Sequence, residues 1–182
     1  RSAEFAERIE RDTGRMDHLV GELLTLARLD TGIIGNLAEA VDLSEIINDI
    51  ADDARFECER EHCHVDSAIE ESLQVTGNRA LIHRAIENIV RNALRHSPAG
   101  GGIGISAKLQ PAANGGQVCI DITDSGSGVP ESDLEAIFQP FFRSANSDNF
   151  AGYGLGLAIS QRVVNAHGGR ISARNRKAGG LQ

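Results

Sequence analysis

Apolar side chains in the first 30 residues recur at a seven-residue spacing, which is typical of one side of a long helix. One position of the repeat holds Ile9, Met16 and Leu23, and the other holds Phe5, Leu19 and Leu26, with Asp12 as the interruption. A helix of this kind needs a second surface to cover its apolar stripe. We expect either that it pairs with helices outside this stretch or in a second chain, or that it packs on its own domain.

The apolar pattern breaks at Thr31-Gly32 and again at Gly35-Asn36. Glycine and asparagine in such positions favour turns. We therefore divide the chain into a helical segment at 1–30, a linker at 31–40 and a domain at 41–182.

The first predicted helix of the domain begins at Ser44, a residue type that favours the N-cap position, and ends near Glu61. Its buried side is expected to hold Ile46, Ile47, Ile50, Ala54 and Phe56. Short runs at 64–69 and 73–75 have the composition of strands.

A second helix is predicted to begin after Asn78 and to run through Arg95, and two runs that alternate apolar and polar residues follow it. These runs, at 103–109 and 118–122, predict an antiparallel hairpin. Later elements are a short helix at 131–137, a helix at 155–166 and a strand at 169–173. Helices and strands mix without a regular repeat, so we expect an α+β fold with helices on one face of a mixed sheet. We also expect a further strand after Gln182.

The composition is that of a soluble globular protein, with 41% hydrophobic and 24% charged residues among 182. A net charge of -8 and only 4% aromatic residues make nucleic acid an unexpected partner. Three cysteines at irregular spacing do not indicate a disulfide framework. No apolar run reaches the roughly 20 residues that span a bilayer. Because the chain begins at Arg1, we treat it as a fragment of a longer protein.

Three polar residues share one side of the helix predicted at 78–95. Asn88, Asn92 and Arg95 lie at i, i+4 and i+7, apart from the apolar face. Amide oxygens can ligate Mg²⁺, and an arginine can neutralise phosphate oxygens. The alternative is that this stripe is only the solvated side of the helix.

Asp124 ends the second strand of the predicted hairpin, and Gly126 and Gly128 follow it. Glycines let the backbone approach a flat ligand, and the carboxylate can accept a hydrogen bond from an exocyclic amine such as that of adenine. An ordinary Asp-Gly turn is the alternative.

A third glycine-rich stretch leads directly into the helix predicted at 155–166. It consists of Gly152, Tyr153, Gly154, Leu155, Gly156 and Leu157. Converging N–H groups and the positive end of a helix favour a phosphate chain at this point. The only lysines are Lys108 and Lys177, which excludes a P-loop, and the glycine spacing differs from that of a dinucleotide-binding fingerprint.

Between the second and third motifs, Phe138, Phe141 and Phe142 precede Arg143 and a polar stretch at 144–152. We expect this stretch to form a lid with Arg143 at its hinge. A phenylalanine cluster that fills the core before a surface loop is the alternative.

Taken together, the motifs resemble those of the GHKL, or Bergerat-fold, ATP-binding domain, in the order found in bacterial sensor histidine kinases. Asn88 to Asn92 is similar to the N box, Asp124 to Gly128 to the G1 box, Phe138 to Phe142 to the F box and Gly152 to Gly156 to the G2 box. The resemblance covers 41–182 and implies a two-layer Bergerat sandwich. Residues 1–30 resemble the second helix of the family's dimerisation and phosphoacceptor hairpin, and 86–95 is most similar to Cpx-type envelope-stress sensors.

The resemblance implies that Mg²⁺ and ATP bind here and that the γ-phosphoryl group passes to a histidine and then to a response regulator. It implies that Asp124 holds the adenine amine and that Asn92, helped by Asn88, ligates Mg²⁺. Catalytic roles are implied for Asn88, Arg95 and Arg143, and nucleotide contacts for Asn88, Asn92, Arg95, His96, Asp124, Gly126, Gly128, Gly152, Gly154, Leu155, Gly156 and Leu157. A homodimer and a place in the cytoplasmic portion of an inner-membrane sensor are implied for the full-length protein.

Two features depart from the family pattern. His96 stands where the family often has tyrosine, and the acceptor context Ser-His-Glu-Leu-Arg-x-Pro is absent. We interpret His18 as a solvated residue beside the apolar stripe, so this fragment is not expected to phosphorylate itself.

A short segment near the end of the first predicted helix of the domain holds four residues of metal-ligand types, Cys58, His62, Cys63 and His64. All four lie within seven residues, which does not favour a zinc site.

Two other functions stay open. An ATP hydrolase of the gyrase and chaperone branch shares the motifs, although Asn88 stands where those enzymes place a glutamate that activates water. A regulatory module that binds nucleotide without transferring phosphate is the second alternative.

Overall fold

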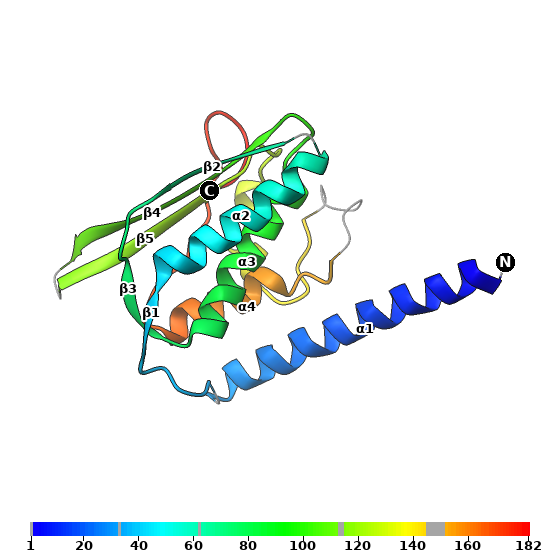
Figure 1. The fold of residues 1–182 in the computed structure, drawn as a ribbon, viewed down its shortest axis with the longest axis horizontal. Coiled ribbons are helices and arrows are strands. Elements are labelled where there is room, and N and C mark those ends of the chain that lie inside the picture. Colours follow the sequence, from blue (N-terminus) through cyan, green and yellow to red (C-terminus); the bar gives the residue numbers. More distant parts are fainter. Residues whose placement is uncertain (1, 33, 62, 113–114, 145–151) are drawn as a thin grey trace.

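A computed structural model describes residues 2–32, 34–61, 63–112, 115–144 and 152–182. Its helices are α1 (Ser2–Asp30), α2 (Leu43–Glu61), α3 (Arg79–His96) and α4 (Gly156–Ala166), with two 3₁₀ turns, η1 (Glu131–Asp133) and η2 (Ala136–Phe138). Its strands are β1 (Glu39–Asp42), β2 (His64–Ile69), β3 (Gln74–Gly77), β4 (Gly102–Ala112) and β5 (Gly115–Thr123). Figure 1 shows α1 as a long rod beside a domain built from the other elements.

The domain has a sheet layer and a helix layer, which confirms the α+β prediction. Strand β2 runs parallel to β4, β4 pairs antiparallel with β5, and β1 pairs antiparallel with β3 in a separate ribbon. Helices α2, α3 and α4 lie on one side of the three-stranded sheet (Figure 1). The core between the layers includes Ile46, Ile47, Val90, Ile103 and Ile105, all nearly without solvent exposure.

The structure corrects two details of α2. Ser44 lies inside the helix, and the Glu45 N–H is capped by the Asp42 carboxylate at 3.2 Å. The Ser44 hydroxyl instead joins two parts of the chain, because it donates to the Glu70 carbonyl at 2.8 Å and accepts from the Leu73 N–H at 2.9 Å. Phe56 is 69% exposed and not buried. It stands two residues from Ala54, about 200° around the helix, so Cys58 takes the expected place in the core.

The elements that follow agree with the sequence more closely. Strand β2 and the hairpin of β4 and β5 form where predicted. Helix α3 begins after Asn78, whose side chain accepts a hydrogen bond from the Leu81 N–H at 3.0 Å. This cap satisfies one of the N–H groups that a helix start leaves without a partner, and it fixes the first turn.

Two predicted elements near the C-terminus are wrong in type. The short helix expected at 131–137 is a pair of 3₁₀ turns. The strand expected at 169–173 does not form in the described chain, where the regular pairing nearby is a bridge between Asn175 and Leu181. A strand exists only where a neighbour accepts its hydrogen bonds, and 169–173 has no such neighbour among the described residues. The further strand expected after Gln182 stays a prediction.

Helix α1 divides its apolar residues between two surfaces. Leu26 and Leu29 are buried together with Leu155, Ile159 and Val163, so the C-terminal part of α1 packs on its own domain. Leu19 is partly buried against the same cluster, whereas Phe5, Ile9, Met16, Val20, Leu23 and Leu24 are exposed. No helix in the described ranges combines the length and apolar character needed to cross a membrane.

Two of the three cysteines are joined, which corrects the expectation of no disulfide. Cys58, near the end of α2, and Cys63, just before β2, form a disulfide with 4.8 Å between their Cα atoms. The reversal of the chain between a helix and the next strand brings them together. Spacing along the sequence cannot show such a pair. His62, one of the metal-ligand residue types in this segment, lies outside the described residues.

Candidate functional site

A cleft of about 1090 Å³ opens along α3, between the turn after β5, the glycine-rich stretch before α4 and one side of α1. The predicted site residues that line it are Asn88, Asn92, Arg95, His96, Asp124, Gly128, Arg143, Gly152, Gly154, Leu155, Gly156 and Leu157. Gly126 is next to the cleft lining but does not belong to it. Segments far apart in the sequence therefore meet around one cavity.

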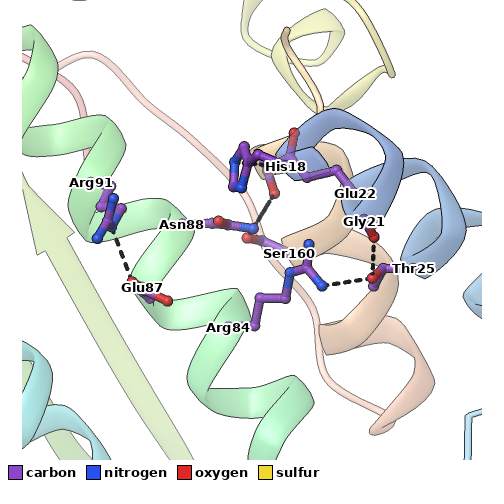
Figure 2. A network of polar contacts seen from close by, with 10 residues as sticks. His18, Gly21, Glu22, Thr25, Arg84, Glu87, Asn88, Arg91 and Ser160 are labelled. Carbon is purple, nitrogen blue, oxygen red and sulfur yellow. Dashed lines mark hydrogen bonds and ion pairs between the residues drawn. The ribbon is translucent and has the colours of Figure 1, made fainter. Parts of the chain in front are cut away.

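The polar stripe of α3 faces the glycine-rich stretch. Asn88 and Asn92 are half-buried, and the Asn88 Nδ2 donates to the Gly156 carbonyl at 3.2 Å. Figure 2 shows Asn88 directed from α3 toward the α1 and α4 side of the cleft. A Cβ atom on Gly152 would lie 2.8 Å from the Arg95 Nη1, so the arginine also lies against this stretch.

The carboxylate of Asp124 stands at the end of β5 and is 5% exposed. Its Oδ1 accepts hydrogen bonds from the Gly126 N–H at 2.8 Å and the Leu181 N–H at 3.1 Å. Among the described residues, both of these bonds use Oδ1, so Oδ2 is available to a ligand in the cleft. A carboxylate oxygen that faces a cleft is a strong acceptor for an amine.

His96 lies at the same end of the cleft as Asp124. Burial lowers the pKa of His96, the nearby Asp124 charge raises it, and the Arg95 charge lowers it again, with a net decrease. The imidazole is therefore neutral at pH 7. A neutral ring at this position is suited to contact with an uncharged base.

Gly154 is a position of the glycine-rich stretch that requires glycine. Gly154 has a φ of +71°, and a Cβ atom there would lie 2.6 Å from the Phe142 carbonyl oxygen. Its own carbonyl accepts a hydrogen bond from the Phe141 N–H at 2.9 Å, which ties the stretch to the phenylalanine segment. Helix α4 begins directly afterwards and has no side-chain cap, so its first N–H groups can bind an anion.

The structure tests only the core interpretation of the phenylalanine segment, and Phe138 alone is buried as that interpretation expects. Phe138 is buried in the core, Phe141 is 60% exposed and Phe142 lines the cleft. Arg143 also lines the cleft. The expected lid falls mainly on residues 145–151, which lie outside the described residues.

The cleft is richer in positive charge than the chain as a whole, which carries a net charge of -8. Its lining includes Arg15, Arg84, Arg91, Arg95 and Arg143. The Arg84 Nη1 donates to the Thr25 hydroxyl at 2.6 Å, and the Arg91 Nε donates to Glu87 at 3.0 Å (Figure 2). Arginines gathered around one cleft of an acidic protein favour a polyanionic ligand.

Residues of α1 also line the cleft, and sequence reasoning missed them. Arg15, His18 and Glu22 form part of the wall, with the His18 Nε2 3.5 Å from a Glu22 carboxylate oxygen. Glu22 is buried, and Figure 2 shows the side chains of His18 and Glu22 near Asn88. The heptad pattern indicated a helix without showing which domain surface it meets, so it carried no signal for this contact.

Comparison with known proteins identifies the family. The model of the histidine kinase-, DNA gyrase B- and HSP90-like ATPase family matches residues 77–182, more than half of the chain. The chain belongs to this family. The matched region contains all four motifs, from the asparagines of α3 to the glycine-rich stretch before α4.

Relatives of this ATPase domain are sensor kinases. The chain is 36% identical over 169 residues to the sensor protein CutS of Streptomyces coelicolor. It is also 36% identical over 182 residues to the sensor protein SphS of Synechococcus elongatus. These alignments cover 92% and 94% of this chain but only 39% and 43% of the relatives. The chain thus spans about two fifths of the length of these curated relatives.

Solved structures of sensor histidine kinases are similar in fold to this chain. The mycobacterial sensor histidine kinase MprB is 31% identical with a TM-score of 0.70, over 79% of this chain and 93% of that chain. ShkA, solved in complex with AMPPNP, has a TM-score of 0.78 over 94% of this chain and 35% of that chain, and its 24% identity supports the fold alone. The ATPase domain described here is the ATP-binding catalytic domain of a sensor histidine kinase. The closer resemblance to Cpx-type sensors stays a prediction.

Proposed function

We propose that the cleft binds Mg-ATP and positions its γ-phosphoryl group for transfer to a histidine on an acceptor hairpin, and from there to a response-regulator aspartate. The observation that carries this proposal is the shared cleft: Asp124 lines one part of it, and Gly152, Gly154 and Gly156 line another. One cavity would thus combine a carboxylate for the base with a helix N-terminus for the phosphates. These features match the two ends of a nucleotide.

At the adenine end, Asp124 is the specificity residue. Its Oδ1 is held by two N–H groups, so Oδ2 can accept from the exocyclic amine of adenine. Guanine has a carbonyl at that position, and the carboxylate would meet an acceptor instead of a donor. The site is therefore expected to prefer ATP over GTP.

At the phosphate end, the chain supplies N–H groups, arginines and amide oxygens. Gly154, Gly156 and the start of α4 would bind phosphate oxygens, and Arg95 and Arg143 would neutralise them. Asn88 and Asn92 fit Mg²⁺ because the Asn88 Nδ2 is bound to Gly156, which leaves the oxygen, the preferred ligand atom, for the metal. When bound, Mg²⁺ screens phosphate charge during phosphoryl transfer.

The geometry disfavours an ATP hydrolase. Asn88 cannot take a proton from water, and the neighbouring Glu87, which also lines the cleft, is engaged by the Arg91 Nε at 3.0 Å. A general base must reach the attacking water within hydrogen-bond distance. A kinase needs instead an acceptor whose side chain is itself the nucleophile.

The partners and location belong to the same proposal. Residues 1–30 would be the second helix of a dimerisation hairpin, and the exposed Ile9, Met16 and Leu23 would contribute to a homodimer of the full-length protein. We place the domain in the cytoplasmic portion of an inner-membrane sensor, where ATP is available. The Cys58–Cys63 disulfide is an observation against this location, because disulfides are uncommon in reducing compartments.

The test has two parts. Thermal unfolding is followed with Mg-ATP and with Mg-GTP, and a ligand at 100 times its dissociation constant should add about 2.7 kcal/mol of stability for ATP alone. Then Mg-ATP labelled in the γ-phosphate is supplied with a histidine-bearing acceptor hairpin. Label on the histidine supports the kinase, ATP binding without label supports a regulatory module, and equal stabilisation by both nucleotides contradicts the adenine site.

A further inference from the structure

The residues after Ala173 fold back over the turn that follows β5. In this segment, the Asn175 Nδ2 donates to the Val129 carbonyl at 2.7 Å, and the Asn175 Oδ1 accepts from the Val129 N–H at 3.0 Å. Figure 1 shows the segment as the red loop near the end of β5. The side-chain amide thus satisfies both polar groups of one residue, as a neighbouring strand would.

Asn175 is also connected to the other end of the same turn. It forms a β-bridge with Leu181, whose N–H donates to the Asp124 Oδ1 at 3.1 Å and whose carbonyl accepts from the Asp124 N–H at 3.1 Å. The next residue, Arg176, donates from Nη1 to the Asp124 carbonyl at 2.6 Å. Both ends of the turn 124–129 are therefore bound to one short segment.

The turn and the segment approach each other as closely as glycine allows. Gly128 has a φ of +70°, and a Cβ atom there would lie 2.5 Å from the Asn175 Oδ1. Gly180 has a φ of +86°, and a Cβ atom there would overlap the Asp124 carbonyl oxygen. Any side chain at either glycine would force the two segments apart.

We propose that Asn175 is a positioning residue of the nucleotide site, which fixes the turn 124–129 and thereby the direction of the Asp124 carboxylate. It does so without touching the nucleotide, because Asn175 is absent from the cleft lining while Asp124, Gly128 and Val129 belong to it. This inference rests on the proposed function, since it assumes that Asp124 receives the base.

Loss of the Asn175 bonds should therefore weaken the binding of the base and leave the binding of the phosphates unchanged. If the turn is not held, nucleotide binding must order it, and that ordering opposes binding. Residues of the phosphate end, such as Asn88 and Gly154, are not bound to Asn175. ADP and ATP should therefore lose the same factor, with or without Mg²⁺.

The deciding variant is Asn175→Asp, which has almost the same size. It keeps an acceptor for the Val129 N–H but replaces the donor with a carboxylate oxygen against the Val129 carbonyl. We expect Kd to rise about tenfold for both ADP and ATP, measured by titration calorimetry at a temperature where circular dichroism shows folded protein. The matched control is Lys177→Ala, an exposed residue of the same loop, which should bind as the wild type does.

Wild-type affinity in Asn175→Asp, or a loss confined to Mg-ATP, would overturn the inference. Should that variant fail to fold, Asn175→Ala takes its place with the same expectations. A second measurement needs no nucleotide: exchange of the Val129 amide hydrogen should be at least about tenfold faster in Asn175→Ala, which removes the acceptor of this N–H. Unchanged exchange overturns the inference. A wild-type protein that binds no adenine nucleotide refutes the proposed function. In that case the exchange measurement alone tests whether Asn175 fixes the turn.

Discussion

The two ends of the cleft are built differently. At the adenine end, Asp124 is buried and bound through its N–H, its carbonyl and its carboxylate to the C-terminal segment. At the phosphate end, the Gly154 carbonyl accepts a hydrogen bond from the Phe141 N–H, and the Gly156 carbonyl accepts from the Asn88 Nδ2 and the Ser160 hydroxyl. The first end is fixed before a ligand arrives, and the second leaves its N–H groups for the ligand. If the proposed function holds, base selection would depend on rigid geometry, and phosphate binding would depend on charge and available donors.

The largest effect is expected where the phosphate end is sterically fixed. Gly154→Ala adds a Cβ at a φ of +71° and 2.6 Å from the Phe142 carbonyl oxygen, which should cost about 2–4 kcal/mol of unfolding free energy. Gly168→Ala is the matched control, because Gly168 has a φ of +73° with no atom within 4 Å of its Cβ. It should cost about 1 kcal/mol. Urea denaturation measures the unfolding free energy of both variants. Equal losses would show that the contact with Phe142 does not contribute to the effect of Gly154→Ala.

At the adenine end, Asp124→Asn should weaken binding of every adenine nucleotide about 100-fold, or about 2.7 kcal/mol. The amide oxygen can keep the bonds from Gly126 and Leu181, but the amide nitrogen would then face the exocyclic amine, donor against donor. Calorimetric titration gives the affinity. Asp121→Asn, on the same strand and bound to Gln182, should leave it unchanged. A tenfold or smaller loss in Asp124→Asn would mean that the base binds elsewhere.

A smaller effect separates the metal from the base. Asn92→Ala should weaken Mg-ATP about tenfold and leave the affinity for ADP in the presence of EDTA unchanged. The same variant therefore serves as its own control. An equal loss with and without metal would place Asn92 in a structural role and remove it from the Mg²⁺ site.

The smallest effect concerns His96, whose pKa in the folded protein is lowered by burial. The unfolded chain then binds a proton more readily, so this residue's contribution to stability is complete above pH 6.5 and is lost as the pH falls through the folded pKa. His96→Gln should lose less unfolding free energy than the wild type between pH 7.5 and pH 5.5. Identical pH dependence in both proteins, measured with urea, would contradict the assigned cause.

Local patterns in the sequence predicted the elements around the cleft well. The boundaries of α3 follow from Asn78 as a cap and from a regular apolar spacing, and the hairpin follows from strict alternation. These signals lie within a few residues of one another, so they do not depend on any distant contact. Local sequence alone was therefore enough to assign the motif residues to their helices and turns.

What the sequence did not show depends on contacts between distant residues. Asp42 replaces Ser44 as the cap of α2 because Ser44 is engaged with Glu70 and Leu73. The Cys58–Cys63 bond depends on where β2 turns back. Two other contacts join segments that share no periodicity, so the spacing of residues could not predict them. These are the contacts of the polar α1 residues with the cleft and the bonds between Asn175 and Val129.

The central claim is that Asp124 and the glycine-rich stretch hold the two ends of one ATP molecule. A crystal structure of this chain grown with Mg²⁺ and a non-hydrolysable ATP analogue tests it most directly. We predict the adenine amine within hydrogen-bond distance of the Asp124 Oδ2, and the phosphates beside Gly154 and the first turn of α4. An analogue bound with its base away from Asp124, or a cleft without nucleotide at saturating concentration, would contradict the claim.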